Sequence, residues 1–314
     1  MKNYFIAYVL IVLIFTTGCS KQSDLDKDGY PKEFKIGIST STEDDPQEAF
    51  GKREPLRLYL EKELNIPVRF YIVNSYAPII EALKAKKIHM AAMSPFQYLI
   101  AHEKANVSAL FYLGKANGKP TNEYISCIIT RKSSRLKTLN DIKINISNLT
   151  LSFVDPASCS GHIMPNYYLK QHGINADEDF KKVMYTSNQL ASVLTLYSGK
   201  VDVACTQISV IKRLAKQKRI PSTDCFNYIW ISDPIIPSSY CVRNDINPKF
   251  RKKLLDAYLN IKKDTAAWGC LMRLRTSKTA STIPLDSLRY VQVDDSAYND
   301  FRKMVKDVKG LEME

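Results

Sequence analysis

The stretch 152–165 holds the residue types with the clearest chemical potential: Ser-Phe-Val-Asp-Pro-Ala-Ser-Cys-Ser-Gly-His-Ile-Met-Pro. Its apolar beginning predicts a strand, and a hydroxyl-rich turn around Ser158 and Ser160 leads directly into a predicted helix. The first N–H groups of a helix have no partner within the helix, so with these hydroxyls they form a cluster of donors suited to an anion. The alternative is that Ser158 or Ser160 only caps the helix, the commoner role of a single serine in such a place.

Two further strand-to-helix turns offer donors of the same kind. Asn74-Ser75-Tyr76 opens one predicted helix, and Ser94-Pro95-Phe96-Gln97-Tyr98 opens another directly after a strand. Each serine alone is expected to be a cap, and each tyrosine a packing residue. Because ligands of open α/β sheets lie beyond the carboxyl ends of the strands, however, the three turns together predict one shared crevice.

Cys159 leaves open a second ligand class and a catalytic alternative. A thiol at a helix start can have a lowered pKa and bind a soft centre such as trivalent arsenic, with Cys205 facing the same cleft. A cysteine that fills an apolar gap is the simpler interpretation. Cys159 could also be a nucleophile, with His162 three residues later as its base. No third orienting group and no zinc-type cysteine pair is identifiable, so we predict neither a catalytic residue nor a metal site.

Alternating strand and helix patterns must position these turns. The first series of predicted elements is strand 34–38, helix 56–64, strand 68–72, helix 76–86, strand 88–93 and helix 95–104. The second series is strand 150–154, helix 160–172, a strand near Val183, helix 189–198 and strand 201–205. Alternation of this kind predicts mostly parallel sheets covered by helices.

Two extended segments, 124–130 and 239–243, follow the first and the second series, and the latter leads into a predicted helix over 248–261. If the C-terminal part of the chain returns to the first lobe, the chain passes between the lobes twice, and we call the two extended segments that make these passages the crossings. We therefore predict a discontinuous lobe, 34–126 plus 240–314, a continuous lobe, 127–239, and a hinge at the crossings.

The N-terminus has the pattern of an export signal. Lys2 precedes an apolar run, 4–15, that is too short to span a bilayer, and small residues end it at Thr17-Gly18-Cys19. Residues 1–18 resemble a bacterial lipoprotein signal that is cleaved before an acylated Cys19; an uncleaved membrane anchor is the alternative. Residues 19–33 then read as a flexible tether. The six other cysteines could pair outside the cytoplasm, but their pairing is not deducible and we assign none.

Composition fits a globular chain of two domains. Of the 314 residues, 45% are hydrophobic and 25% are charged. The formal net charge of +13 could attract nucleic acid, an acidic membrane surface or a small anion. Because the basic runs carry no interleaved aromatic residues, we expect no nucleic-acid surface.

The order and spacing of several motifs resemble the phosphonate, phosphite and phosphate binding proteins of ABC transporters, the PhnD-like family. The resemblance covers most of the chain beyond Cys19. It rests on residues 36–64, 76–83, 94–98, 155–161, 199–204 and 232–237. It implies a two-lobed α/β fold of the type II periplasmic-binding-protein kind, with a ligand cleft between the lobes. It also implies a monomer without a cofactor that serves in transport and is not an enzyme.

By this resemblance, hydroxyls and backbone amides hold a tetrahedral oxyanion. The expected ligand-binding residues are Tyr76, Ser94, Tyr98, Ser158, Cys159, Ser160, Gly161, Gln189 and Thr206. Cys159 stands where the family usually has a threonine, which exchanges a good donor for a weak one. Gln189 and Leu190 stand where aminophosphonate-binding members carry a histidine and an acidic residue. Since Leu190 cannot pair with an ammonium, we expect aminoethylphosphonate to bind poorly, and phosphate, phosphite or a small alkylphosphonate to bind better.

We therefore expect a lipid-anchored protein of the bacterial cell envelope, exposed to the periplasm or the cell exterior. It would close around an oxyanion and deliver it to a membrane permease. The same closure would serve a sensor that reports to a membrane kinase. An arsenite-binding protein that uses Cys159, and a cysteine-dependent enzyme that uses Cys159 and His162, are the other hypotheses.

Overall fold

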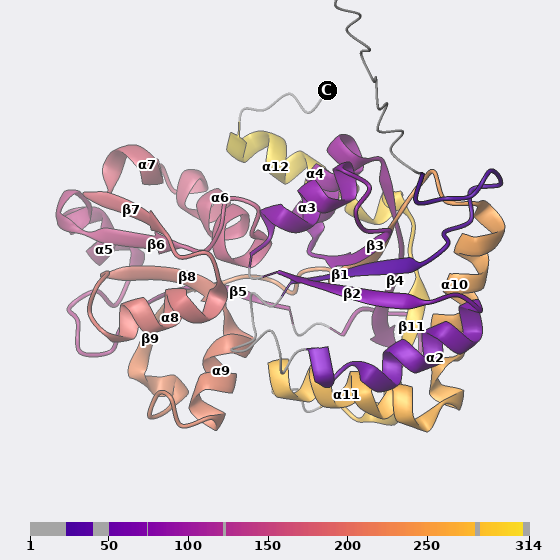
Figure 1. Cartoon of the computed structure of the whole chain (residues 1–314). Helices are drawn as coiled ribbons and strands as arrows, with labels where there is room; N and C mark the ends of the chain where they lie inside the picture. The colour runs from indigo at the N-terminus through magenta and orange to yellow at the C-terminus, as the bar shows by residue number, and fades with distance from the viewer. Residues whose placement is uncertain (1–22, 40–49, 74, 122–123, 280–282, 310–314) are drawn as a thin grey trace, which may run out of the picture.

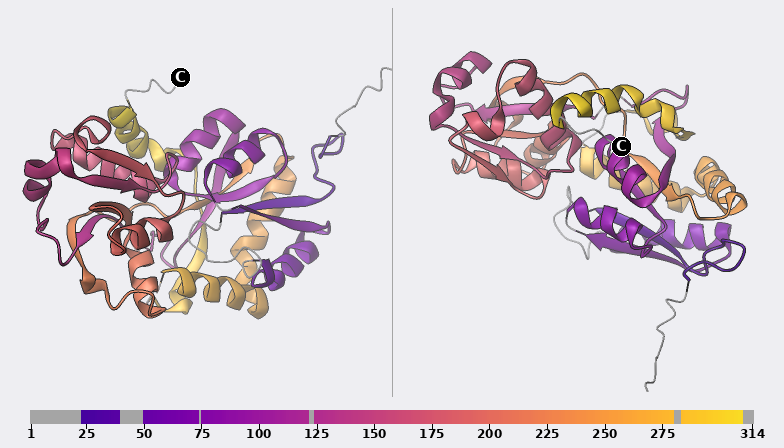
Figure 2. Two further views of the ribbon diagram at one scale, coloured as in Figure 1. Left: turned by 60° about the vertical axis from the view of Figure 1, so that its left-hand side comes forward. Right: turned by 90° about the horizontal axis from the view of Figure 1, so that it is seen from above.

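Two sheets organise the chain. The computed structural model describes residues 23–39, 50–73, 75–121, 124–279 and 283–309 (Figure 1). One sheet has six strands and the other five, and the two bodies built on them lie side by side (Figure 2). We call the body with the six-stranded sheet lobe 1 and the other lobe 2. The prediction of a two-lobed α/β fold is confirmed.

Lobe 1 is assembled from two separate segments of the chain, and its sheet has the order β11-β4-β10-β3-β1-β2. Its strands are β1 (Phe34–Ser39), β2 (Val68–Val73), β3 (Met90–Met93), β4 (Val107–Lys115), β10 (Ser239–Arg243) and β11 (Leu288–Gln292). Its helices are α2 (Glu54–Leu64), α3 (Ala77–Lys84), α4 (Pro95–Ala105), α10 (Pro248–Asn260), α11 (Thr265–Thr279) and α12 (Asn299–Lys309).

Lobe 2 comes from the intervening segment, and its sheet has the order β7-β6-β8-β5-β9. Its strands are β5 (Ser126–Arg131), β6 (Thr150–Phe153), β7 (Lys182–Tyr185), β8 (Val203–Gln207) and β9 (Phe226–Ile231). Its helices are α5 (Leu139–Asn145), α6 (Met164–Gln171), α7 (Ala176–Asp179), α8 (Gln189–Tyr197) and α9 (Ile208–Lys216).

The sheets are less parallel than we predicted. In lobe 1, β1 pairs in parallel with β2 and β3, but β10 runs antiparallel to β3 and β4, and β11 antiparallel to β4. In lobe 2, β6 pairs in parallel with β7 and β8, and β5 runs antiparallel to β8 and β9. The two predicted crossings are β5 and β10 themselves. Each of these two strands enters its sheet from the other lobe. Each therefore lies antiparallel to its neighbours in that sheet.

The predicted helix over 160–172 begins as a π-helical turn, Cys159–Ile163, and continues as α6. Gly161 lets this turn lie directly on the end of β6, because a Cβ atom there would come within 2.2 Å of the Val154 side chain. Val154, Cys159 and Ile163 belong to the same buried cluster as Phe96 of lobe 1. The lobes also touch where α9 packs on α11 and where α6 packs on α12.

The segment 23–33 is not the flexible tether that we predicted. Arg243 is 2% exposed, and its guanidinium pairs with the carboxylates of Asp24 and Asp245 at 2.5 and 2.8 Å. Asp24 Oδ2 also lies 2.9 Å from Nε2 of the fully buried His89. A buried cation needs such counter-charges, so Arg243 fixes Asp24 to lobe 1. Cys19 and the predicted signal lie outside the described residues.

Two further findings concern the cysteines and the membrane. The six cysteines in the described part are all free thiols. In that part no helix combines the length and the apolar character that crossing a bilayer requires.

Candidate ligand-binding cleft

A cavity of about 370 Å³ lies where the two lobes meet. Lobe 1 contributes the carboxyl ends of β1 and β3, the start of α4, and parts of β4, β10, β11, α10 and α11. Lobe 2 contributes Gln207 and Ser209 at the junction of β8 with α9, while Tyr124 and Pro237 come from the crossings. The cavity is therefore a cleft between lobes, at strand ends where α/β proteins bind ligands.

Charged residues in the lining are of one sign. Arg53 and Arg275 line the cavity, and the described lining includes no aspartate or glutamate. Arg53 is 5% exposed, so its charge is little screened by solvent. This lining favours an anion over a cation or a zwitterion.

Gln97 presents a donor without a partner. Its Oε1 accepts hydrogen bonds from the backbone amide and the hydroxyl of Ser94, both at 3.1 Å, in a capping box at the start of α4. The backbone N–H can only donate, so this contact fixes which end of the carboxamide is the oxygen. Nε2 therefore points away from Ser94, and it is buried with no acceptor among the described residues. Because Gln97 lines the cavity, this donor is available to an acceptor atom of a bound ligand.

Three tyrosines form an aromatic wall in the same cavity. The rings of Tyr240, Tyr258 and Tyr290 lie 5.1 to 5.7 Å apart between centroids. The hydroxyls of Tyr240 and Tyr290 are 3.5 Å apart. The hydroxyl of Tyr258 is buried and, within the described chain, has no partner. Burial raises the pKa of Tyr258 well above its usual value, so this hydroxyl stays protonated and can donate.

Two of the predicted ligand-binding residues line the cavity, Tyr76 and Ser94. The backbone amide of Tyr76 interacts with the carboxylate of Asp155 in lobe 2. Burial raises the pKa of Asp155, although this interaction and a hydrogen bond from Ala157 N, at 2.8 Å, act in the opposite direction.

The predicted turn, Ser158 to Gly161, lies beside the cavity but is not part of its lining. Ser158 Oγ accepts from Gly161 N at 3.1 Å, so this serine caps the helix, as the simpler interpretation held. The hydroxyl of Tyr124 interacts with the side chains of Ser160 and Cys159. Tyr124 also lines the cavity, so its side chain connects the cavity with the turn.

Gln189 and Thr206 form a buried network behind that turn. Gln189 Nε2 donates to the hydroxyls of Ser158 and Ser160 at 3.3 and 3.1 Å. Its Oε1 accepts from Thr206 Oγ1 at 2.9 Å and from Gln207 N at 3.1 Å. The carboxamide thus joins the starts of α6 and α8 to the end of β8, and its hydrogen-bonding groups are occupied within the protein.

Tyr98 does not fit the role that we predicted for it. It is fully buried, and its hydroxyl donates to Asp295 at 2.5 Å. Its ring packs on Tyr298 with centroids 4.4 Å apart. Tyr98 lies four residues beyond Ser94, and its side chain is directed into the core of lobe 1, where it holds the segment before α12.

The thiol of Cys159 is not activated, contrary to the soft-ligand and nucleophile hypotheses. Cys159 is 1% exposed, and burial raises its pKa to about 12. Cys205 is packed in the core of lobe 2 and does not face the cleft. His162 Nδ1 lies 2.9 Å from the carbonyl of Pro156. In the described part of the chain, no group of His, Cys, Asp and Glu side chains could hold a metal ion.

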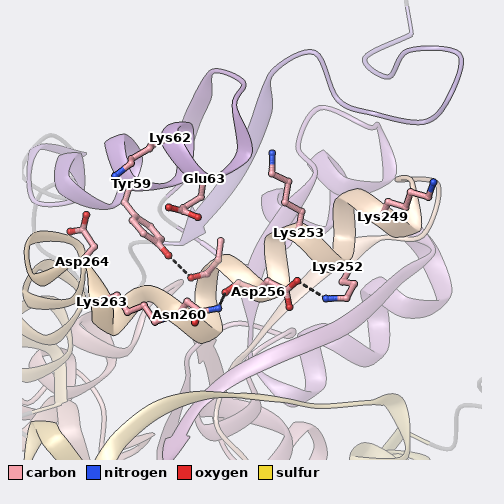
Figure 3. Close-up of a pocket in the computed structure, with 11 residues that line it drawn as sticks. Tyr59, Lys62, Glu63, Lys249, Lys252, Lys253, Asp256, Asn260, Lys263 and Asp264 are labelled. Carbon is pink, nitrogen blue, oxygen red and sulfur yellow. Dashed lines mark hydrogen bonds and ion pairs between the residues drawn. The ribbon is translucent and has the colours of Figure 1, made fainter.

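A second hollow, of about 590 Å³, lies between α2 and α10 on lobe 1 (Figure 3). Five lysines and three acidic residues line it, and contacts such as Lys252 to Asp256 at 2.6 Å balance part of the charge. No residue of lobe 2 contributes to it, so closure of the lobes would not complete a site there.

Sequence reasoning missed Arg53, Gln97, Tyr124 and Arg275. The spacing of Ser94 and Gln97 is that of a capping box, so the sequence carried a signal for Gln97. Arg53 directly precedes α2 and Arg275 lies in α11, and these two helices pack together only in the tertiary structure. No local pattern marks them.

Comparison with known proteins identifies the family. Residues 38–298 match the family described as ABC transporter, phosphonate, periplasmic substrate-binding protein. The phosphonates-binding periplasmic protein of Escherichia coli is 27% identical over 260 residues, which are 80% of this chain and 72% of that protein. The phosphate-import protein PhnD of Mycolicibacterium smegmatis is 22% identical, over 98% of this chain and 95% of its own.

The fold of a solved relative agrees with this match. The crystal structure of a binding protein component of an ABC phosphonate transporter from Pseudomonas aeruginosa superposes with a TM-score of 0.74 at 21% identity. The superposition covers 88% of this chain and 86% of the other. The family match extends through both lobes and includes the cleft between them. The chain therefore belongs to the periplasmic substrate-binding proteins of ABC phosphonate transporters.

Proposed function

We propose that this protein captures a phosphorus oxyanion, namely phosphate, phosphite or a phosphonate, in the cleft between its lobes and delivers it to the permease of an ABC transporter. The observation that carries the proposal is Nε2 of Gln97, a buried donor without a partner among the described residues, in a cavity whose described charged lining residues are Arg53 and Arg275. Leaving such a group unpaired costs about 1–3 kcal/mol, which a ligand oxygen would recover. The relatives named for phosphonate and phosphate support the same class of ligand.

Capture would proceed by closure of the lobes. We propose a hinge at the two crossings, between lobe 1 (34–126 plus 240–314) and lobe 2 (127–239). Tyr76 of lobe 1 and Gln207 of lobe 2 both line the cavity, so movement of the lobes would open and close it. A permease can distinguish the closed form from the open one, as could a membrane kinase in a sensory role.

The family belongs to the periplasm or cell envelope, and we propose that lipid on Cys19 holds this member, as a monomer, at a membrane. Neither alternative based on Cys159 gains support. Its thiol is buried and protonated, whereas arsenite binding and nucleophilic attack both need an accessible thiolate.

Calorimetric titration of the chain from Ser20 onward tests the proposal. Phosphate, phosphite and methylphosphonate are the ligands, with sulfate, aminoethylphosphonate and arsenite as comparisons. At about a hundred times its dissociation constant, a ligand adds roughly 2.7 kcal/mol to the stability, so thermal unfolding gives a second readout. Binding of at least one phosphorus oxyanion in preference to sulfate and arsenite is expected; binding of arsenite alone would contradict the proposal.

A further inference from the structure

The cavity is large for a simple oxyanion. A volume of about 370 Å³ lies within the range of sites for organic ligands, roughly 300–1,000 Å³. The lobes pack on each other through α9 and α11, so this is the volume of the cleft with the two lobes in contact. Phosphate, with one phosphorus and four oxygens, would leave most of this space unfilled.

Apart from Arg53, whose charge opposes the rise that burial causes in the pKa of Tyr240, and Arg275 of α11, the walls away from Ser94 and Gln97 are mainly apolar. Leu271 and Leu274 of α11, Leu113 of β4 and Phe70 of β2 line the cavity together with the aromatic wall. Side chains of this kind stabilise a ligand by removing apolar surface from water, which an inorganic ion does not have.

The unpaired hydroxyl of Tyr258 lies within this apolar region. Tyr258 is fully buried on α10, and its ring packs against those of Tyr240 and Tyr290. A second donor without a partner in the described chain, on a different element from Gln97, indicates that a ligand offers a further polar atom there.

We propose that the ligand is a phosphorus oxyanion with a bulky, mainly apolar or aromatic substituent that carries one hydrogen-bonding atom. The oxyanion binds at Ser94 and Gln97, and the substituent fills the space beside Tyr240 and Tyr258. This inference rests on the proposed function, since it assigns the substituent of the same ligand. Phosphate and methylphosphonate then bind through the oxyanion contacts alone, and more weakly.

The substitution Ala92→Phe tests the substituent space. Ala92 lines the cavity, its side chain is exposed, and it pairs across the strands with Tyr240, so a phenyl ring there occupies the space without entering the core. Ala266→Phe is the matched control, because Ala266 is an exposed alanine of α11 outside the lining. Titrations of the purified protein use methylphosphonate, benzylphosphonate and 4-hydroxybenzylphosphonate.

In the unsubstituted protein we expect benzylphosphonate to bind at least about 10-fold more tightly than methylphosphonate, and the 4-hydroxy compound more tightly still. Ala92→Phe should weaken both benzyl compounds about 10-fold or more and change methylphosphonate binding less than about 3-fold, with no effect from Ala266→Phe. The inference is overturned, and the proposed function left intact, if the unsubstituted protein binds methyl- and benzylphosphonate with equal affinity. The same holds if Ala92→Phe lowers the affinity for both compounds equally. Absence of binding by every phosphorus oxyanion overturns both.

Discussion

The carboxylate of Asp155 lies close to the backbone amide of Tyr76, and this interaction acts to lower the pKa of the carboxyl group. Asp155 follows β6 in lobe 2, and Tyr76 opens α3 in lobe 1 and lines the cleft. The interaction thus joins the lobes at a residue expected to contact the ligand. Contacts of this kind contribute to the free energy of closure, and so to the observed affinity.

Asp155→Ala should weaken ligand binding about 10-fold, because the contact between the lobes loses the interaction of the carboxylate with the Tyr76 amide. Asp155→Asn retains an acceptor oxygen and should bind within about 3-fold of the unsubstituted protein. Titration with the tightest phosphorus oxyanion measures both. If Asp155→Ala binds as tightly as Asp155→Asn, this contact has no part in closure.

Gln97→Glu should lower affinity for a phosphorus oxyanion by 20-fold or more, on the order of 2 kcal/mol, because a carboxylate replaces the donor in a cavity that must hold an anion. The glutamate keeps an acceptor for Ser94, but because Gln97 is 3% exposed the buried charge should also lower the melting temperature, so binding is measured well below it. Gln171→Glu, at an exposed position on α6, adds the same charge away from the cleft. Equal effects of the two substitutions would show that net charge, and not the Gln97 amide, governs binding.

Replacing Ser158 and Ser160 together by Ala should lower the stability as well as the affinity. The two hydroxyls accept both hydrogen bonds of the buried Gln189 amide, and its loss of partners costs about 1–3 kcal/mol. Urea unfolding measures the stability, with Ser147→Ala, outside the network, as a control. Unchanged stability would contradict the structural role that these bonds assign to the serines.

The thiol of Cys159 should not react with Ellman's reagent in the folded chain from Ser20 onward. Burial raises its pKa to about 12 and leaves it 1% exposed. Among the described cysteines, Cys225 alone is partly exposed and should react first, and Cys225→Ser provides the control. Mass spectrometry of the labelled peptides assigns the site; rapid labelling of Cys159 would revive the soft-ligand hypothesis.

The stability should rise with pH between about 4 and 6.5. Burial lowers the pKa of His89 to about 4 from 6.5, although the nearby Asp24 carboxylate acts in the opposite direction. In this window the unfolded chain binds a proton that the folded one does not, so acid favours unfolding. Across this pH window the free energy of unfolding should increase by on the order of 3 kcal/mol. His89→Gln should flatten the curve of urea-unfolding free energy against pH, and an unchanged slope would contradict the assignment.

Local patterns predicted the helices and strands around the cleft well. Leu56, Tyr59, Leu60 and Leu64 were expected on one face of a helix, and they are the buried residues of α2. The serine of the Ser94 turn was expected near a ligand, and it lines the cavity. These features follow from periodicity and from turn chemistry, which neighbouring residues determine.

Features that depend on long-range packing could not be predicted. Tyr98 and Ser94 lie in one motif, yet a partner nearly two hundred residues away, Asp295, directs Tyr98 into the core. The hydroxyl-rich turn was expected to bind the ligand, but its residues do not line the cavity, whereas Tyr124 from a distant segment lines the cavity and interacts with the turn. Burial reversed the expectation for Cys159, because a helix start lowers a thiol pKa only where the charge is solvated or paired.

The ion pair of Asp24 with Arg243 shortens the reach of the proposed anchor. Five Cα steps separate Cys19 from Asp24, and fully extended chain spans at most about 3.6 Å per residue, so the attachment point lies within roughly 18 Å of lobe 1. A lipid on Cys19 would thus keep lobe 1 close to the surface of the bilayer. Encounter with a permease would then be a two-dimensional search by lateral diffusion, and only a limited range of orientations would be available to the cleft.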